Sequence, residues 1–313
     1  MLYDLCSDLH IDSYRWPEHR RGLLSVDWAA VRNPGSTVLA IIGDTHNHYR
    51  KSIEMAERAA GVYDHVILTD GNHEHYSTKR PVTINMRRIA DKVERRPRLT
   101  YLDGTTHYRH GDIVFLGCNG WYDWEIMCPE ISREHQYLTW LGQFPGVKPL
   151  NPLDSTGRGS NDKDLRFSVN EFYSWDEKPS DPSVFARVQA DRLASQVETF
   201  SRDDTVRHIV VLTHTAPRRD LLRDYPHNIV NQRFNGSYGN SRMAQVQAIP
   251  GHKIIHWGYG HTHERRDVVR NGILFVNNSR GYASEQDGRS PWAPVQLDTE
   301  NIGPLLAAGA DSD

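Results

Sequence analysis

Short runs of apolar, mostly β-branched residues recur along the chain, and most of them end in a polar cluster. Runs of about four to six such residues are typical of strands that are buried on both faces. Amphipathic helical patterns separate several of these runs, at residues 50–60, 81–95 and 184–200. Buried strands that alternate with helices predict an α/β fold.

The polar residues that follow the runs are of types that bind divalent metal ions. Sites in α/β folds lie beyond the carboxyl ends of strands, so we expect these side chains to gather there. Carboxylates and imidazoles suit Mn, Fe, Zn or Ni, and the lack of Cys among these residues argues against a purely structural zinc site. These residues are Asp8, His10, Asp44, Asn72, His73, His214, His261 and His263.

Two pairs of candidate ligands share one spacing. Asp8 and His10 are two residues apart, and so are His261 and His263. On extended backbone, side chains at this spacing point to the same side and lie about 6–7 Å apart, enough to reach two neighbouring ions. Ions in two-metal sites lie roughly 3.5–4 Å apart. A bridging carboxylate is then needed, for which Asp44 is the natural candidate.

The polar clusters form an ordered set of motifs. They read Asp-x-His at 8–10, Gly-Asp at 43–44, Gly-Asn-His-Glu at 71–74, Thr-His at 213–214 and Gly-His-x-His at 260–263. The last motif alone is expected by chance in about one of fifteen such chains, but the ordered set is a strong signal. In these motifs the chain resembles the calcineurin-like metallophosphoesterases, especially the bacterial and phage predicted phosphoesterases. The segments 117–124 and 278–282 add to this resemblance.

The resemblance implies a four-layer αββα sandwich with two divalent metal ions, Mn first and Fe, Zn or Ni as alternatives. One ion would be held by residues at the first set of family positions, here Asp8, His10, Asp44 and His263. The other would be held at the second set, here Asp44, Asn72, His214 and His261. His73 matches the histidine that contacts the scissile phosphate and protonates the leaving group. The implied reaction is attack of a metal-bound hydroxide on a phosphate ester.

One position departs from the phosphoprotein-phosphatase branch of the family. That branch continues Gly-Asp as Gly-Asp-x-x-Asp-Arg-Gly, and its second Asp orients the catalytic His. Here Asn47 stands at that position and the Arg-Gly is absent. This difference argues against a protein phosphatase. It leaves Asn47 and Glu74 as possible partners that orient His73.

We predict a phosphodiesterase that acts on a small nucleotide-type substrate, with a phosphomonoesterase as the close alternative. Asn47 and the aromatic residues near Trp121 favour the diester. A nuclease is disfavoured, because 37 Lys and Arg against 40 Asp and Glu give a net charge of −3 without a concentrated basic groove. A non-catalytic scaffold is disfavoured because every motif position is filled.

Candidate substrate contacts lie near the motifs. They are Asn47, Trp121, Tyr122, Arg218 and Arg280. Trp121 and Tyr122 suit a pocket for a base or aryl group, but core packing explains them equally well. Arg218, Arg280 and Tyr282 suit a phosphate or substrate contact, with a solvated or structural role as the alternative. We expect His46, His48 and His75 to be solvated loop residues.

The chain organisation indicates one domain over residues 1–302 with a disordered tail at 303–313. Residues 143–183 read as a long loop or cap insert that shapes substrate choice. No apolar run suggests a signal peptide or a transmembrane helix, and three Cys give no disulfide framework, so we expect a cytoplasmic protein. The expected partner is a small phosphate ester, not a membrane, and the sequence leaves the oligomeric state open.

Overall fold

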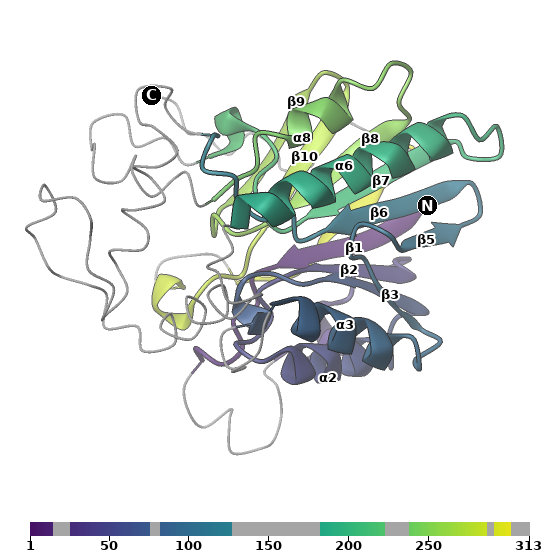
Figure 1. Ribbon diagram of the computed structural model, residues 1–313. Helices are drawn as coiled ribbons and strands as arrows, with labels where there is room; N and C mark the ends of the chain where they lie inside the picture. Colours follow the sequence, from purple (N-terminus) through teal and green to yellow (C-terminus); the bar gives the residue numbers. More distant parts are fainter. Residues whose placement is uncertain (15–25, 76–81, 127–181, 223–237, 287–290, 302–313) are drawn as a thin grey trace, which may run out of the picture.

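The chain folds into two sheets that face each other, with helices on the outer side of each (Figure 1). This computed structural model describes residues 1–14, 26–75, 82–126, 182–222, 238–286 and 291–301. Figure 1 shows α2 and α3 against one sheet and α6 and α8 against the other, which gives four layers. The predicted αββα sandwich is therefore confirmed.

The first sheet has the strand order β11-β1-β2-β3-β4. Its parallel strands are β1 (Leu2–Ser7), β2 (Val38–Ile42), β3 (His65–Thr69) and β4 (Leu99–Tyr101), and β11 (Val295–Asp298) is antiparallel to β1. Its helices are α1 (Trp28–Val31), α2 (Tyr49–Ala59) and α3 (Val82–Val93). Every residue of β2 is buried, as expected for a parallel strand covered on both faces.

The second sheet has the strand order β5-β6-β7-β8-β10-β9. Its parallel strands are β6 (Ile113–Cys118), β7 (His208–Thr213), β8 (Ile254–Tyr259) and β10 (Ile273–Asn278), with antiparallel edges β5 (His107–His110) and β9 (Arg265–Arg270). Its helices are α6 (Pro182–Ser201) and α8 (Met243–Gln247). Short 3-10 turns are η2 (His73–His75), η3 (Arg219–Leu221) and η4 (Ala283–Glu285).

Apolar side chains fill the space between each pair of layers. Strand β1 illustrates the division, because successive strand residues point to opposite faces. Tyr3 and Leu5 belong to the cluster between the sheets, whereas Cys6 belongs to the cluster that includes Ile53 of α2. Leu193 of α6 packs in a third cluster on the outer face of the second sheet.

The two sheets are joined where their parallel strands end. Ser7, the last residue of β1, forms a parallel bridge to Ser279, which directly follows β10. The backbone N–H of Arg280 donates to the Ser7 carbonyl at 3.0 Å, and that of Gly281 to the Asp8 carbonyl at 2.9 Å. Loops from both sheets therefore meet at one edge of the sandwich.

Two predicted segments fall largely outside the described residues. The insert at 143–183 overlaps them only at its last two residues, which belong to the first turn of α6, and the tail at 303–313 lies wholly outside. Among the helices that the structure describes, none combines the length and apolarity needed to span a bilayer.

Candidate metal centre

The predicted ligands lie together at the carboxyl edge where the sheets meet. The loops after β1, β2 and β3 carry Asp8, His10, Asp44 and Asn72, and those after β7 and β8 carry His214, His261 and His263. Ligand atoms lie within 4.8 Å of one another in three groups: Asp8–His10–His263, His10–Asp44–His73 and Asp44–His214–His261. The structure therefore brings the candidate ligands together, and Asp44 belongs to two of the three groups.

The first half of the cluster brings two imidazoles and a carboxylate together. Nε2 of His10 lies 2.8 Å from Nε2 of His263, and Oδ1 of Asp8 lies 3.6 Å from His263 Nε2 and 4.0 Å from His10 Nε2. Nδ1 of His263 lies 2.8 Å from a carboxylate oxygen of Glu285. A proton held on Nδ1 by that carboxylate leaves the Nε2 lone pair directed at the space between Asp8 and His10.

The second half of the cluster centres on His214. Its Nε2 lies 3.1 Å from Oδ2 of Asp44 and 3.2 Å from Oδ1 of Asn72. Its Nδ1 lies 3.3 Å from the carbonyl of Ile42, the last residue of β2. Donation from Nδ1 to this carbonyl directs Nε2 at the Asp44 carboxylate, and an ion bound there would replace the proton on Nε2.

The electrostatics of the cluster follow from burial and close opposite charges. Burial opposes ionisation of Asp44, yet the neighbouring His214 and His73 hold its pKa well below the usual range. Asp44 in turn raises the pKa of His214 to about 10, although burial alone would lower it. Burial, reinforced by His73, lowers the pKa of His10 well below its usual value. Asp44 is therefore ionised and His10 neutral, the forms in which these side chains bind metals.

The donor set and its surroundings fit divalent metal ions. Carboxylate, amide and imidazole donors are the ligands that Mn, Fe and Zn take in proteins. Glycines make the close packing possible: a Cβ on Gly71 would lie 2.1 Å from Oδ1 of Asp44, and one on Gly260 would lie 2.5 Å from Oδ2 of Asp8. A single added carbon would therefore displace the carboxylate of a candidate ligand, so the close packing of the cluster requires glycine at these positions.

The backbone at the ligands is not extended, so our expectation that the spaced pairs reach their ions from extended segments is wrong. Positive φ angles occur at five of these residues: Asp8 (49°), His10 (39°), Asp44 (49°), His261 (68°) and His263 (52°). Strands β1 and β8 have already ended there, and left-handed turns bring the side chains together. Non-glycine residues adopt such angles rarely and do so preferentially at functional sites.

His73 lies beside the ligands and its ring is held from one side. Its Nδ1 lies 2.5 Å from Oδ1 of Asn47, and its Nε2 lies 3.8 Å from Oδ2 of Asp44. The Asn47 amide oxygen can only accept, so Nδ1 carries a proton and Nε2 faces the cluster. Of the two partners left open by the sequence, Asn47 is the one in contact with the ring.

Glu74 supports the ligand loops instead. Its buried carboxylate accepts hydrogen bonds from the backbone N–H groups of Asp44 (3.0 Å), Thr45 (2.8 Å) and Gly71 (2.7 Å), and from the Ser52 hydroxyl (2.8 Å). Burial and the nearby Asp44 raise the pKa of Glu74 to about 7. One side chain thus joins the loops after β2 and β3 to helix α2.

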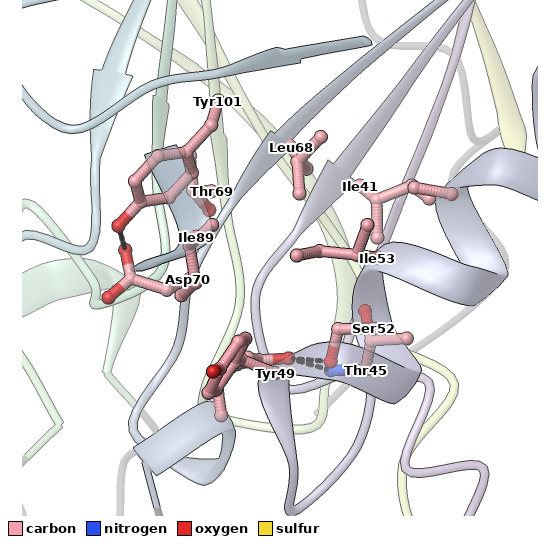
Figure 2. Close-up of a pocket in the computed structure, with 12 residues that line it drawn as sticks. Ile41, Thr45, Tyr49, Ser52, Ile53, Leu68, Thr69, Asp70, Ile89 and Tyr101 are labelled. Atoms are coloured by element: carbon pink, nitrogen blue, oxygen red, sulfur yellow. Dashed lines mark hydrogen bonds between the residues drawn. The ribbon is translucent and has the colours of Figure 1, made fainter. Parts of the chain in front are cut away.

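A small cavity lies behind this support, between the first sheet and the helices α2 and α3 (Figure 2). Its apolar wall includes Ile41 and Leu68 from the sheet, Ile53 from α2 and Ile89 from α3. None of the described residues that line it is a predicted metal ligand. The cavity therefore belongs to the packing beneath the site and is separate from the metal centre.

Our expectation that His75 is solvated is wrong. Its side chain is 1% exposed, and its Nε2 lies 2.8 Å from Oδ2 of Asp70. Figure 2 shows the hydroxyl of Tyr101 donating to the other oxygen of Asp70, at 2.9 Å. His75 belongs to the turn η2, and its ring points inward, with its centroid 5.7 Å from that of the Trp121 ring. His46 and His48 are half-buried, and His48 caps α2.

The predicted substrate contacts have different surroundings. Trp121 and Tyr122 are 1% and 5% exposed and pack in an apolar cluster, although the Tyr122 ring also lies parallel to His261 at 6.4 Å. The Arg280 guanidinium lies over the ring of Tyr14 at 3.7 Å. Arg218 is paired with a neighbouring carboxylate of η3, and the structure does not bring it to the ligand cluster.

Three further residues contact the site, and of these the sequence offered only Tyr282, as a phosphate or substrate contact. Tyr282 Oη lies 3.1 Å from Nε2 of His73, Glu285 contacts His263, and the Ser279 hydroxyl donates to Oδ2 of Asp8 at 2.7 Å. The Asn-x-x-Gly-Tyr segment that ends at Tyr282 is part of the family resemblance and marks this loop. No sequence signal marks Glu285.

Comparisons with known proteins agree with this architecture. No family model matches the chain. An uncharacterized protein of Acanthamoeba polyphaga mimivirus is 23% identical over 301 residues, which cover 93% of this chain and 95% of the relative. The crystal structure of a phosphopantetheinyl hydrolase from Mycobacterium tuberculosis matches with a TM-score of 0.63 and 17% identity, over 96% of this chain and 98% of that chain.

The chain has the metallophosphoesterase fold. The match to the phosphopantetheinyl hydrolase extends over both sheets and the helices, because it covers nearly the whole of each chain. A dimetal phosphatase from Danio rerio matches with a TM-score of 0.43 and 15% identity, over 88% of this chain and 86% of that chain, and adds no further weight.

Proposed function

We propose that this protein is a metal-dependent phosphoesterase, a hydrolase that cleaves phosphoric ester bonds. The observation that carries the proposal is the cluster of candidate ligands: three groups of donor atoms, each within 4.8 Å, of which two contain Asp44. Two divalent ions, when bound, supply charge neutralisation for a phosphate and lower the pKa of a water molecule that attacks phosphorus. We take Mn²⁺ as the first ion to test.

The proposed ligands divide into two sets that share the Asp44 carboxylate. One set is Asp8, His10, Asp44 and His263. The other set is Asp44, Asn72, His214 and His261. The close approach of His10 to His263, and that of His214 to Asp44 and Asn72, support this division.

His73 is the proposed general acid. Its Nε2 faces the cluster, because Asn47 holds the proton on Nδ1. In the imidazolium form His73 carries a second proton, on Nε2. A phosphate bound at the metal centre would bring its leaving-group oxygen toward this N–H, which can then supply the proton that the departing alkoxide needs. Asn47 orients this ring without adding a negative charge, unlike the aspartate of the phosphoprotein phosphatases.

We propose a small phosphodiester of nucleotide type as the substrate, and a phosphomonoester as the alternative. The rings of Tyr122 and Tyr238 beside His261, at 6.4 Å and 4.7 Å, support a substrate with an aryl or base group. The burial of Trp121 favours its core-packing role over a pocket role. Because one solved structure of this fold is a phosphopantetheinyl hydrolase, a pantetheine-bearing diester belongs among the test substrates.

The test compares bis(p-nitrophenyl) phosphate with p-nitrophenyl phosphate, with Mn²⁺ present and after EDTA. We expect chelator-sensitive cleavage, faster on the diester, that is lost in Asp44→Asn and strongly reduced in His73→Ala. His110→Ala is the matched control, because His110 is exposed on the edge strand β5. Preference for the monoester would support the alternative substrate. Stoichiometric metal binding without turnover of any ester would refute the proposed activity.

A further inference from the structure

The loop after β10 packs against the metal centre without supplying a predicted ligand. It is tied to the end of β1 by the Ser279 hydroxyl, which donates to Oδ2 of Asp8 at 2.7 Å, and by the N–H of Gly281, which donates to the Asp8 carbonyl at 2.9 Å. The position of this loop is therefore set relative to a ligand and not only relative to its own sheet.

Tyr282 in this loop lies directly on the ligand side chains. Its ring centroid lies 4.2 Å from that of His10 and 4.8 Å from that of His263. Its backbone N–H donates to Oε2 of Glu285 at 2.8 Å, the same oxygen that contacts Nδ1 of His263. Backbone and ring are thus both held, which gives the hydroxyl a defined place.

That place is beside the working nitrogen of His73. Tyr282 Oη lies 3.1 Å from His73 Nε2, while His73 Nδ1 is engaged by Asn47. A leaving-group oxygen that takes a proton from His73 must come within about 2.6–3.2 Å of Nε2. It therefore arrives next to the Tyr282 hydroxyl, which can donate a hydrogen bond to it.

We propose that Tyr282 is a further catalytic residue of the reaction proposed above, on which this inference rests. As the bond from phosphorus to the leaving oxygen breaks, the electron pair goes to that oxygen, which receives the Nε2 proton of the His73 imidazolium and leaves the neutral ring with its proton on Nδ1. The Tyr282 hydroxyl donates a hydrogen bond to the same oxygen and keeps its own proton. The negative charge that develops before protonation is complete is thereby stabilised.

The test is the dependence of rate on the leaving group. Tyr282→Phe keeps the ring on His10 and removes only the hydroxyl. On diesters whose leaving alcohol ranges from p-nitrophenol through phenol to an alkyl alcohol, we expect a loss of less than about threefold for p-nitrophenol. For the alkyl alcohol we expect a loss of about 10–100-fold, because only a basic leaving oxygen needs a donor. His73→Ala should show a gradient of the same sign.

Controls separate this role from a structural one. Tyr14→Phe removes a hydroxyl that donates to the Gly281 carbonyl at 3.0 Å and supports the same loop without contacting His73. It should leave the leaving-group dependence unchanged. Bound Mn²⁺, measured by elemental analysis, should be equal in wild type and in Tyr282→Phe.

Each other outcome overturns the inference in a recognisable way. An equal loss on all leaving groups in Tyr282→Phe, or loss of Mn²⁺, would mean that Tyr282 only supports the fold of the site. An unchanged rate throughout would mean that the hydroxyl has no part in the reaction. Absence of turnover by the wild type on every ester would remove the proposed function itself, and this inference with it.

Discussion

Replacing Glu285 by Gln is expected to weaken the binding of one metal ion and leave the other unaffected. Oε2 of Glu285 accepts from the Tyr282 N–H and contacts Nδ1 of His263, each at 2.8 Å. The amide oxygen of Gln can still accept, so the perturbation removes the charge and keeps the shape. Hydrogen bonds to charged groups contribute about 1.5–3 kcal/mol and neutral ones about 1 kcal/mol. The change is therefore roughly 1 kcal/mol per bond.

The exposure of Glu285 moderates this figure. Its side chain is 33% exposed, so water screens part of the charge, and we take about 1.4 kcal/mol in total. This corresponds to about tenfold in metal affinity, at the low end of the 10–100-fold that groups supporting metal ligands typically contribute. Only the site that contains His263 should change, because His214 is oriented by the Ile42 carbonyl instead.

The assay is calorimetric titration of metal-free protein with Mn²⁺. We expect two binding phases in wild type and a tenfold weaker constant in one of them for Glu285→Gln. Glu54→Gln serves as the matched control, because Glu54 is a half-exposed glutamate on α2 that pairs only with Lys51 at 2.7 Å among the described residues. Unchanged constants, or equal weakening of both phases, would refute the argument that Glu285 acts through His263.

Three further predictions test other parts of the structure. Asn47→Ala should lower kcat about 10–100-fold with Mn²⁺ content unchanged, since His73 loses a bond worth about 1–3 kcal/mol; loss of metal instead would show that Asn47 supports the ligands. Gly71→Ala should abolish tight Mn²⁺ binding and lower Tm, because its Cβ would lie 2.1 Å from Asp44 Oδ1; a wild-type thermal melt with intact binding would contradict the crowding. Burial lowers the pKa of His256 to about 4 from an ordinary 6.5. The unfolded chain therefore binds a proton on His256 more tightly than the folded chain does. The free energy of unfolding should fall by up to about 3 kcal/mol as pH drops from 6.5 to 4. Urea titrations across this pH range measure the free energy of unfolding, and His256→Gln should flatten its dependence on pH. An equal pH dependence in wild type and variant would mean that another group causes the loss of stability.

Much of the fold was predictable because the chemistry of a doubly covered parallel strand is visible in its residues. Runs such as the one at 38–42 can be buried on both faces only if helices and a second sheet cover them, and β2 is indeed buried throughout. The gathering of the proposed ligands was predictable for a related reason. Polar residues that follow such runs lie beyond the strand ends, and neighbouring parallel strands end at the same edge of the sheet.

The local geometry of the site was not predictable in the same way. Spacing suggested that His261 and His263 act from extended backbone, but both have positive φ, which contacts with the surrounding structure must hold. One such bond is the His261 N–H to Asp8 Oδ1 at 3.0 Å. His75 was likewise expected to be solvated, because nothing in the sequence shows that its ring contacts the buried carboxylate of Asp70.

The contribution of the loop after β10 shows why such supports escape sequence reasoning. A candidate ligand is recognisable from its residue type and its place after a strand, whereas Glu285 and Tyr282 contact residues more than 20 and 200 positions away. Their roles depend on the second sheet meeting the first at Ser7 and Ser279. The two proposed ligand sets draw on both sheets, so the apolar layer that fixes one sheet on the other also fixes the distances between metal ligands. Packing between the sheets, at residues such as Tyr3 and Phe115, is therefore part of what makes the site competent.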